Sequence, residues 1–244
     1  MIKFDLNNRV AVVTGGAQGF GLAITERFIE AGAKVVIWDI DESAAKKVID
    51  KVKSENLSYQ IVDVTNFEIV NKNLEEIEKK HRKIDIFVNN AGIAGMNTTV
   101  AEYPLDEWKK VMNLNLNSVF YCCKAVVPFM LKNDYGRIVN IASIASITAI
   151  GSNIAYCAMK AAVVNMTKSL DRVLAPIRVN AISPGLVDTE LTKEWKDYRE
   201  KQIDLTPLKI LTTTADVANE VLHLILSDNI TGQNIVLDGG RTLN

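Results

Sequence analysis

The stretch Arg9-Val-Ala-Val-Val-Thr14-Gly15-Gly-Ala-Gln-Gly19-Phe-Gly21 decides the fold of this chain. Its first half is a short β-branched run, which is typical of a buried parallel strand. Three glycines follow at once, and an amphipathic helical pattern then continues to about Gly32, a residue type that commonly ends helices. A strand, a tight turn and a helix in this order predict the start of a βαβ unit.

Strand and helix patterns alternate along the rest of the chain. The spacing predicts further strands at 34–39, 59–62, 84–88, 137–141, 177–182 and 234–237, and further helices at 42–54, 67–81, 105–131, 156–174 and 214–226. Pro128 is expected to bend the long helix near its end. We therefore predict an α/β fold, with a single doubly wound, Rossmann-like parallel sheet and helices on both faces, in one domain over residues 1–244.

Composition excludes several classes of protein. A net charge of −1 offers no electrostatic attraction for nucleic acid or an anionic membrane. The N-terminal residues lack the apolar core of a signal peptide, and no uninterrupted apolar run reaches membrane-spanning length. Cys122, Cys123 and Cys157 are odd in number and lack C-x-x-C spacing, so neither disulfides nor a metal site is expected. A cytoplasmic protein without nucleic-acid or membrane partners is the expectation.

The glycine-rich turn has the position of a nucleotide site. Gly15, Gly19 and Gly21 separate a strand from a helix, where a pyrophosphate can meet the helix N-terminus. Asp39 lies twenty residues after Gly19, the spacing of an acid that binds ribose hydroxyls. The alternative is a tight turn without a ligand. Asp39 would repel a 2′-phosphate, and Gln18 supplies no compensating cation, so NAD is favoured over NADP.

A second group of residues could carry proton transfer. Tyr156 and Lys160 are four residues apart, so they share one face of the predicted helix. A phenol with a pKa of about 10 is a weak base near neutral pH, and a nearby ammonium group is expected to lower that pKa. Ser143, at the end of an apolar run, could hold the same substrate oxygen. Alone, this spacing also fits a helix with an incidental Tyr and Lys.

The combined motifs resemble those of the short-chain dehydrogenases/reductases. They are Thr14-Gly-x-x-x-Gly19-x-Gly21, Asn89-Asn-Ala-Gly92, Ser143, Tyr156-x-x-x-Lys160, Pro184-Gly185 and the terminal Thr231-Gly-Gln-x-x-x-x-Asp238-Gly-Gly240. The resemblance covers essentially the whole chain. It implies a catalytic set of Asn115, Ser143, Tyr156 and Lys160, in which Asn115 holds a water that links Lys160 to solvent. Asn113 is a nearby alternative, but the family pattern favours Asn115.

The resemblance also implies contacts to the cofactor. The residues are Gly15, Gln18, Gly19, Phe20, Gly21, Asp39, Asp63, Val64, Asn89, Ala91, Gly92, Tyr156, Lys160, Pro184, Gly185, Val187 and Thr189. Asp63 and Val64 would contact adenine, and Thr189 would reach the nicotinamide amide. The charged segment 190–210 would be a substrate lid, although Leu191, Trp195 and Tyr198 at helical spacing also fit an ordinary surface helix.

These features predict an NAD-dependent oxidoreductase that interconverts a secondary alcohol and a ketone, with Tyr156 as acid and base. A sugar, polyol or sugar acid is the expected substrate class, and 3-oxoacyl-(acyl-carrier-protein) reductase is the alternative. Two other classes are a nucleotide-sensing protein that has lost catalysis and a structural subunit. The pocket candidates are small or apolar and include no Arg to bind a carboxylate or phosphate: Ala94, Gly95, Met96, Ala149, Asn153 and Val187.

Two helical segments predict self-association. Residues 118–131 and 155–164 carry one Lys each and are otherwise almost entirely apolar or small, so they lack the polar face of an ordinary surface helix. Neighbouring loops could cover them, but a second copy of the chain is the favoured partner. In the family that the chain resembles, these helices meet across a two-fold axis. We therefore expect a homotetramer, or failing that a dimer.

Overall fold

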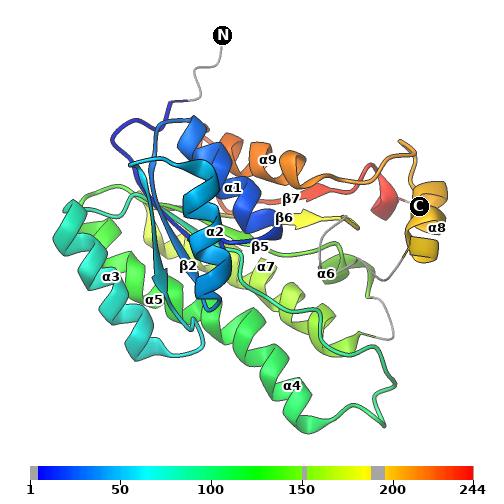
Figure 1. Cartoon of the computed structure of the whole chain (residues 1–244). Coiled ribbons are helices and arrows are strands. Elements are labelled where there is room, and N and C mark those ends of the chain that lie inside the picture. The colour runs from blue at the N-terminus through cyan, green and yellow to red at the C-terminus, as the bar shows by residue number, and fades with distance from the viewer. Residues whose placement is uncertain (1–4, 150–152, 188–195, 244) are drawn as a thin grey trace.

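The apolar, β-branched segments form one parallel sheet in the computed structural model, which describes residues 5–149, 153–187 and 196–243 (Figure 1). Its strands are β1 (Val10–Thr14), β2 (Lys34–Asp39), β3 (Leu57–Ile61), β4 (Ile86–Asn89), β5 (Arg137–Ile141), β6 (Arg178–Pro184) and β7 (Asn234–Leu237). They lie in the order β3-β2-β1-β4-β5-β6-β7, and each neighbouring pair is parallel. The predicted sheet is confirmed.

The strand order reverses beside β1. The chain first builds outward from β1 to β3, then returns to place β4 on the other side of β1, where Val12 pairs with Phe87. Parallel strands bring their carboxyl ends to one edge of the sheet, and loops leaving β1 and β4 diverge there. Such a reversal point is where open α/β sheets bind ligands.

Helices cover both faces of the sheet (Figure 1). The α-helices are α1 (Gly19–Glu30), α2 (Glu42–Val52), α3 (Phe67–His81), α4 (Leu105–Met112), α5 (Ser118–Lys132), α6 (Ala145–Thr148), α7 (Ile154–Leu174), α8 (Lys196–Leu205) and α9 (Thr214–Leu226). One apolar core includes residues of α1, α2 and α9, and the other includes residues of α3, α5 and α7. The sheet separates these two cores, as the doubly wound prediction requires.

The long helix predicted at 105–131 is not regular. It consists of α4, a π-helical turn η1 (Asn113–Asn117) and α5. Pro128, which was expected to bend its end, lies inside α5. The unit Leu105–Lys132 is long and apolar enough by composition to cross a membrane, yet 44% of its most apolar window is buried within this fold. Its apolar side packs against α3 and the sheet.

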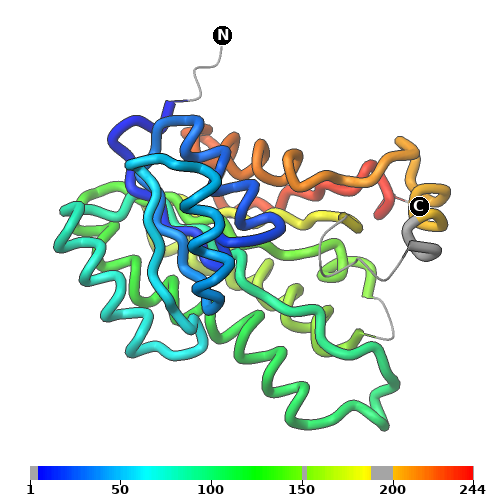
Figure 2. Tube along the Cα trace, viewed as in Figure 1, coloured from blue at the N-terminus to red at the C-terminus, as the bar shows by residue number. Residues whose placement is uncertain are grey.

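The C-terminal segment returns to the helix that follows β6. Figure 2 shows α8 and the chain end side by side. The Arg241 Nε atom donates to the Gln202 Oε1 atom of α8 at 3.0 Å, and just after α8 the Leu208 N–H donates to the Gly239 carbonyl oxygen at 3.2 Å. In the predicted lid, α8 is the helix of the described part, whereas Leu191 and Trp195 lie outside the described residues. Closure of segment 190–210 as a lid stays a prediction.

Candidate functional site

The glycine loop leaves the N-terminus of α1 open. A side chain built on Gly21 would come within 2.0 Å of the Gly15 carbonyl oxygen, so no larger residue fits there. At Gly19, whose φ is +54°, a Cβ atom would meet nothing within 4 Å. The N-cap residue Gln18 makes no side-chain capping bond, and the first turn holds no acid. The end of α1 therefore fits an anionic phosphate, which would accept from its backbone N–H groups.

Asp39 closes the other side of this loop. It is the last residue of β2 and is buried. Its Oδ2 atom accepts from the Ala17 N–H at 3.1 Å, and its Oδ1 atom accepts from the Asp41 N–H at 3.1 Å. The carboxylate is thus fixed beside the glycine loop, where the sequence predicted a ribose contact. This arrangement would place a negative charge near a ribose bound at the loop.

Thr14 and Asn90 tie the loops after β1 and β4 together. The Asn90 side-chain amide donates to the Thr14 and Gly15 carbonyl oxygens at 2.9 and 3.1 Å. The Thr14 hydroxyl in turn accepts from the backbone N–H groups of Asn90 and Ala91. Both residues lie in the sequence motifs, which by themselves indicate no role for either side chain. Their function is to hold the two sides of the reversal point together.

The Asn89 side chain is hydrogen-bonded to another residue of the protein. Its amide donates to the Asn140 Oδ1 atom at 2.8 Å, and the Asn140 amide donates to the Thr167 hydroxyl at 2.9 Å. These residues are buried and connect β4, β5 and α7. The side chain of Asn89 is therefore buried and hydrogen-bonded within the fold. Farther along, Val64 is buried, and exposed Asp63 accepts from the Thr65 backbone and hydroxyl groups.

Ser143 and Tyr156 meet at the carboxyl end of β5. The Ser143 hydroxyl accepts from the Ala145 N–H at 3.1 Å and also forms a hydrogen bond with the half-buried Tyr156. Burial raises the pKa of Tyr156, and the Ser143 hydrogen bond only partly opposes that rise. The pKa of Tyr156 is thus raised overall, whereas the sequence predicted a lowered one. Desolvation of the phenolate outweighs its neighbours.

Lys160 lies beneath the ring of Tyr156, one turn along α7. Its Nζ atom is 5.6 Å from the ring centroid and donates to the Ile141 carbonyl oxygen at 2.7 Å. The residue is only 5% exposed, and burial lowers the pKa of its ammonium group to about 8. This amine therefore releases its proton more readily than that of an ordinary Lys. The predicted sharing of one helix face by Tyr156 and Lys160 is confirmed.

The π-helical turn brings Asn115 toward the same place. Its side-chain amide donates to the carbonyl oxygens of Ile93 and Val111 at 2.9 and 3.1 Å. A Cβ atom on Gly92 would lie 2.6 Å from Asn115 Oδ1 and 3.6 Å from Lys160 Nζ. The lack of a side chain at Gly92 therefore lets Asn115 and Lys160 approach one another. Asn113, the alternative candidate, instead accepts from Asn117 on an exposed surface.

The turn after β6 runs beside Ser143. The carbonyl oxygen of Pro184 accepts from the Ile144 N–H at 3.0 Å, and the Gly185 N–H donates to the Leu237 carbonyl oxygen at 2.7 Å. Val187 is buried and forms a parallel bridge with Thr212. Thr189 lies outside the described residues. The structure thus brings the end of β6 to the loop that carries Ser143, as the predicted cofactor set requires.

A polar residue stands among the predicted pocket candidates. Asn153 is buried and donates to the Ala94 carbonyl oxygen at 2.9 Å, which joins the start of α7 to the loop after β4. Among the other pocket candidates, Gly95 and Ala149 have positive φ values of +73° and +48°, and Met96 is 46% exposed.

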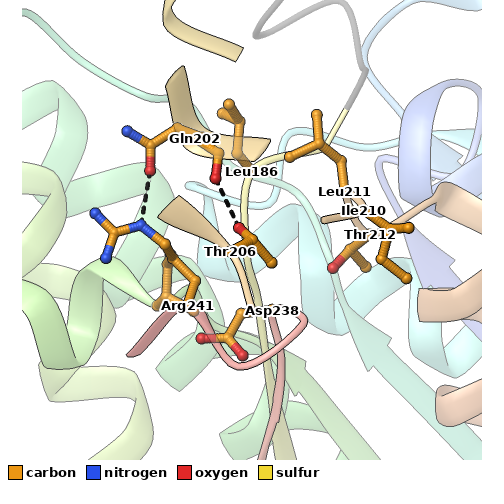
Figure 3. Close-up of a pocket in the computed structure, with 10 residues that line it drawn as sticks. Leu186, Gln202, Thr206, Ile210, Leu211, Thr212, Asp238 and Arg241 are labelled. Atoms are coloured by element: carbon orange, nitrogen blue, oxygen red, sulfur yellow. Dashed lines mark hydrogen bonds between the residues drawn. The ribbon is translucent and has the colours of Figure 1, made fainter. Parts of the chain in front are cut away.

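The sequence analysis missed Arg241 and Gln202, which line a small pocket beside Ile144 (Figure 3). The position of Arg241 directly after Gly239-Gly240 was the available signal.

Comparisons with known proteins agree with this geometry. The family described as Enoyl-(Acyl carrier protein) reductase matches residues 15–242. An NAD-dependent glycerol dehydrogenase from Listeria innocua is 40% identical over 98% of this chain and 96% of its own length. A 3-oxoacyl-(acyl-carrier-protein) reductase from Chlamydia pneumoniae is 36% identical over 99% and 100%. The crystal structure of an NAD+-bound xylitol dehydrogenase aligns with a TM-score of 0.89 at 30% identity, over 96% of this chain and 99% of that one.

Proposed function

Because the chain belongs to the short-chain dehydrogenase/reductase family of oxidoreductases, which act on CH–OH groups, we propose that it is an NAD-dependent dehydrogenase of a sugar, polyol or sugar acid. The observation that carries this proposal is the convergence of Ser143, Tyr156 and Lys160 at the carboxyl edge of the sheet, next to an open helix N-terminus and a fixed acid.

The chain's own residues position the alcohol and move its proton. Ser143 holds the substrate oxygen by a hydrogen bond; Tyr156 as the phenolate takes the hydroxyl proton during oxidation, and as the phenol it returns that proton during reduction. Lys160 lies behind the Tyr156 ring, and a pKa of about 8 lets its amine exchange a proton with its surroundings more readily than an ordinary Lys. Asn115, on the π-helical turn, would hold a water that links Lys160 to solvent. The nicotinamide cofactor, when bound, supplies the hydride acceptor or donor.

NAD is the proposed cofactor for an electrostatic reason. The Asp39 carboxylate is buried and held against the glycine loop by the Ala17 N–H. A 2′-phosphate bound there would face this charge at short range, whereas free ribose hydroxyls could donate to it. The names of two similar proteins support the choice, since one is an NAD-dependent glycerol dehydrogenase and the other was crystallised with NAD+.

The proposed substrate class is supported by the names of several similar proteins. Those similar to this chain include a glycerol dehydrogenase, a meso-2,3-butanediol dehydrogenase and a 2-dehydro-3-deoxy-L-rhamnonate dehydrogenase. A second candidate function is reduction of a 3-oxoacyl thioester, because several relatives at 33–36% identity are reductases of that kind. Asp39 favours NAD over NADP, and NAD generally serves oxidation. The alcohol dehydrogenase is therefore the favoured candidate.

A paired screen tests the proposal. Purified protein is assayed with NAD+ against polyols, sugars and sugar acids, and with NADH against acetoacetyl thioesters. Turnover with an alcohol and NAD+, at kcat/KM above that of the thioester reaction, is the expected result. The Tyr156→Phe variant keeps the ring and loses only the hydroxyl, so kcat is expected to fall by about 100-fold or more. Failure to oxidise any alcohol, or more than a tenth of the wild-type kcat in the variant, would contradict the proposal.

A further inference from the structure

A small pocket borders the loop that carries Ser143. It has about 240 Å³ of space, counted with the solvent at its mouth. Ile144 lines it and directly follows Ser143, and Gly185 lines it from the turn after β6. The opposite wall comes from α8 and the C-terminal segment (Figure 3). Its enclosed space has room for about one water molecule, so a group at the end of a substrate would meet the pocket at its mouth.

Most polar groups in this wall are already satisfied. The Thr206 hydroxyl donates to the Gln202 carbonyl oxygen at 2.7 Å, and the Thr212 hydroxyl donates to the Leu237 carbonyl oxygen at 2.7 Å. The Asp238 carboxylate accepts from the backbone N–H groups of Gly240 and Thr242 at 2.9 and 2.7 Å. These two bonds form the turn that places Arg241 and offset part of the negative charge of Asp238.

Arg241 is different because only one edge of its guanidinium group is engaged. Its Nε atom donates to the Gln202 Oε1 atom at 3.0 Å, which fixes the plane of the group. Among the described residues, no hydrogen bond or ion pair reaches its two Nη atoms. Figure 3 shows these atoms on the side of the group that faces away from Thr206 and Asp238. A fixed guanidinium group with free Nη donors matches a carboxylate or phosphate in two-point geometry.

We propose that Arg241 binds an anionic end group of the substrate at the mouth of this pocket, and that Gln202 orients it. Ile144, which directly follows Ser143, and Leu186 also line this pocket, so the anion would belong to a part of the substrate other than the carbinol. The inference rests on the proposed function and narrows it toward hydroxy acids. A carboxylate of a sugar acid and a phosphate of a pantetheine thioester share the required chemistry.

Binding titrations separate this inference from catalysis. Wild type, with and without NADH, is titrated by calorimetry with D-gluconate and with D-glucitol, which differ only in a carboxylate against a hydroxymethyl group. A second pair, 4′-phosphopantetheine and pantetheine, presents the phosphate. Arg241→Gln removes the cation and Gln202→Leu removes its orienting partner. The matched control is Lys209→Gln, which removes a nearby positive charge that does not line the pocket.

We expect Arg241→Gln to weaken binding of the anionic member of one pair by about tenfold or more, since it removes a charge-assisted, two-point contact. Gln202→Leu should have a smaller effect in the same direction, and Lys209→Gln should leave both pairs within about twofold of wild type. The pair that responds identifies carboxylate or phosphate. Equal losses for charged and neutral members, or no loss in either pair, would overturn the inference. Anion binding without turnover of any alcohol would instead contradict the proposed function alone.

Discussion

At the scale of single residues, the site depends on groups whose protonation is set by burial. Tyr156 has a raised pKa and Lys160 has a lowered one, so both are shifted toward their uncharged forms. Neither direction is visible in a sequence, because burial arises only when β5, α7 and the loop after β4 pack together. The sequence did predict which residues meet, since an interval of four places two side chains on one helix face.

Lys160→Met should change how stability depends on pH. The folded pKa of about 8 lies below the ordinary Lys value of about 10.4, so between these values the unfolded chain binds more protons. Wild-type stability attributable to this residue therefore rises with pH through that window. At about pH 7 the variant should be more stable by on the order of 1–3 kcal/mol, and the difference should narrow by about pH 10.

Urea unfolding at the two pH values measures this difference. Lys168→Met, an exposed change on the same helix, is the control and should leave the pH dependence of wild type unchanged. A constant difference between Lys160→Met and wild type at both pH values would show that the amine is not desolvated.

Asp39→Ala should narrow the preference for NAD over NADP. The change removes the negative charge and also leaves the Ala17 and Asp41 N–H groups without their acceptor. We expect kcat/KM with NAD to fall by about tenfold or more, and kcat/KM with NADP to fall less or rise. Steady-state kinetics with both cofactors decide the point. Asp41→Ala removes the N-cap of α2 and should lower stability without altering the cofactor ratio.

At the scale of helices and strands, the sequence predicted regular elements better than irregular ones. Helices α3 and α9 and strands β5 and β7 begin and end where the spacing predicted. The π-helical turn at Asn113–Asn117 was not predicted, because one extra residue hardly disturbs the apolar spacing of a long helix. The pairing of Arg241 with Gln202 was equally hidden, since the two residues are 39 positions apart.

The bond between Asn140 and Thr167 anchors α7 to β5. Thr167 is fully buried, and its hydroxyl accepts from Asn140 and donates to the Val163 carbonyl oxygen. Thr167→Val keeps the shape but leaves the Asn140 amide without this acceptor, so we expect a loss of about 1–3 kcal/mol. Thr167→Ser retains the hydroxyl and should cost less than the Val variant. Chemical denaturation of the three proteins would contradict this account if Val were tolerated as well as Thr.

At the scale of the whole molecule, α5 and α7 expose large apolar side chains to solvent. Phe120 and Leu131 of α5 are 47% and 48% exposed, and Val173 of α7 is 76% exposed. We propose that a second copy of the chain covers these helices and that the protein is a homotetramer, or failing that a dimer. Helix α7 would then contact the sheet on one side and the second copy on the other. These contacts would fix the positions of Tyr156 and Lys160, which α7 carries.

Sedimentation at micromolar concentration should show the tetramer, and Phe120→Asp should shift it toward smaller species by placing a charge in the contact. Val100→Asp changes an apolar residue outside these helices that is more exposed than Phe120, and it should not alter the sedimentation. A fully active monomer of 27.0 kDa would rule out the proposed assembly.

The parallel sheet has a practical consequence for attaching the protein to a solid support. The described candidate ligand contacts lie where the strands end. The opposite rim of the sheet can therefore be attached to a bead or electrode without blocking the entry of ligands. The exposed Glu55 lies on that rim, just before β3 begins. The three native cysteines are buried, and burial raises the pKa of Cys123 to about 12. A thiol introduced as Glu55→Cys would therefore react with a maleimide surface ahead of the native ones and would orient every molecule with its open edge toward the solution.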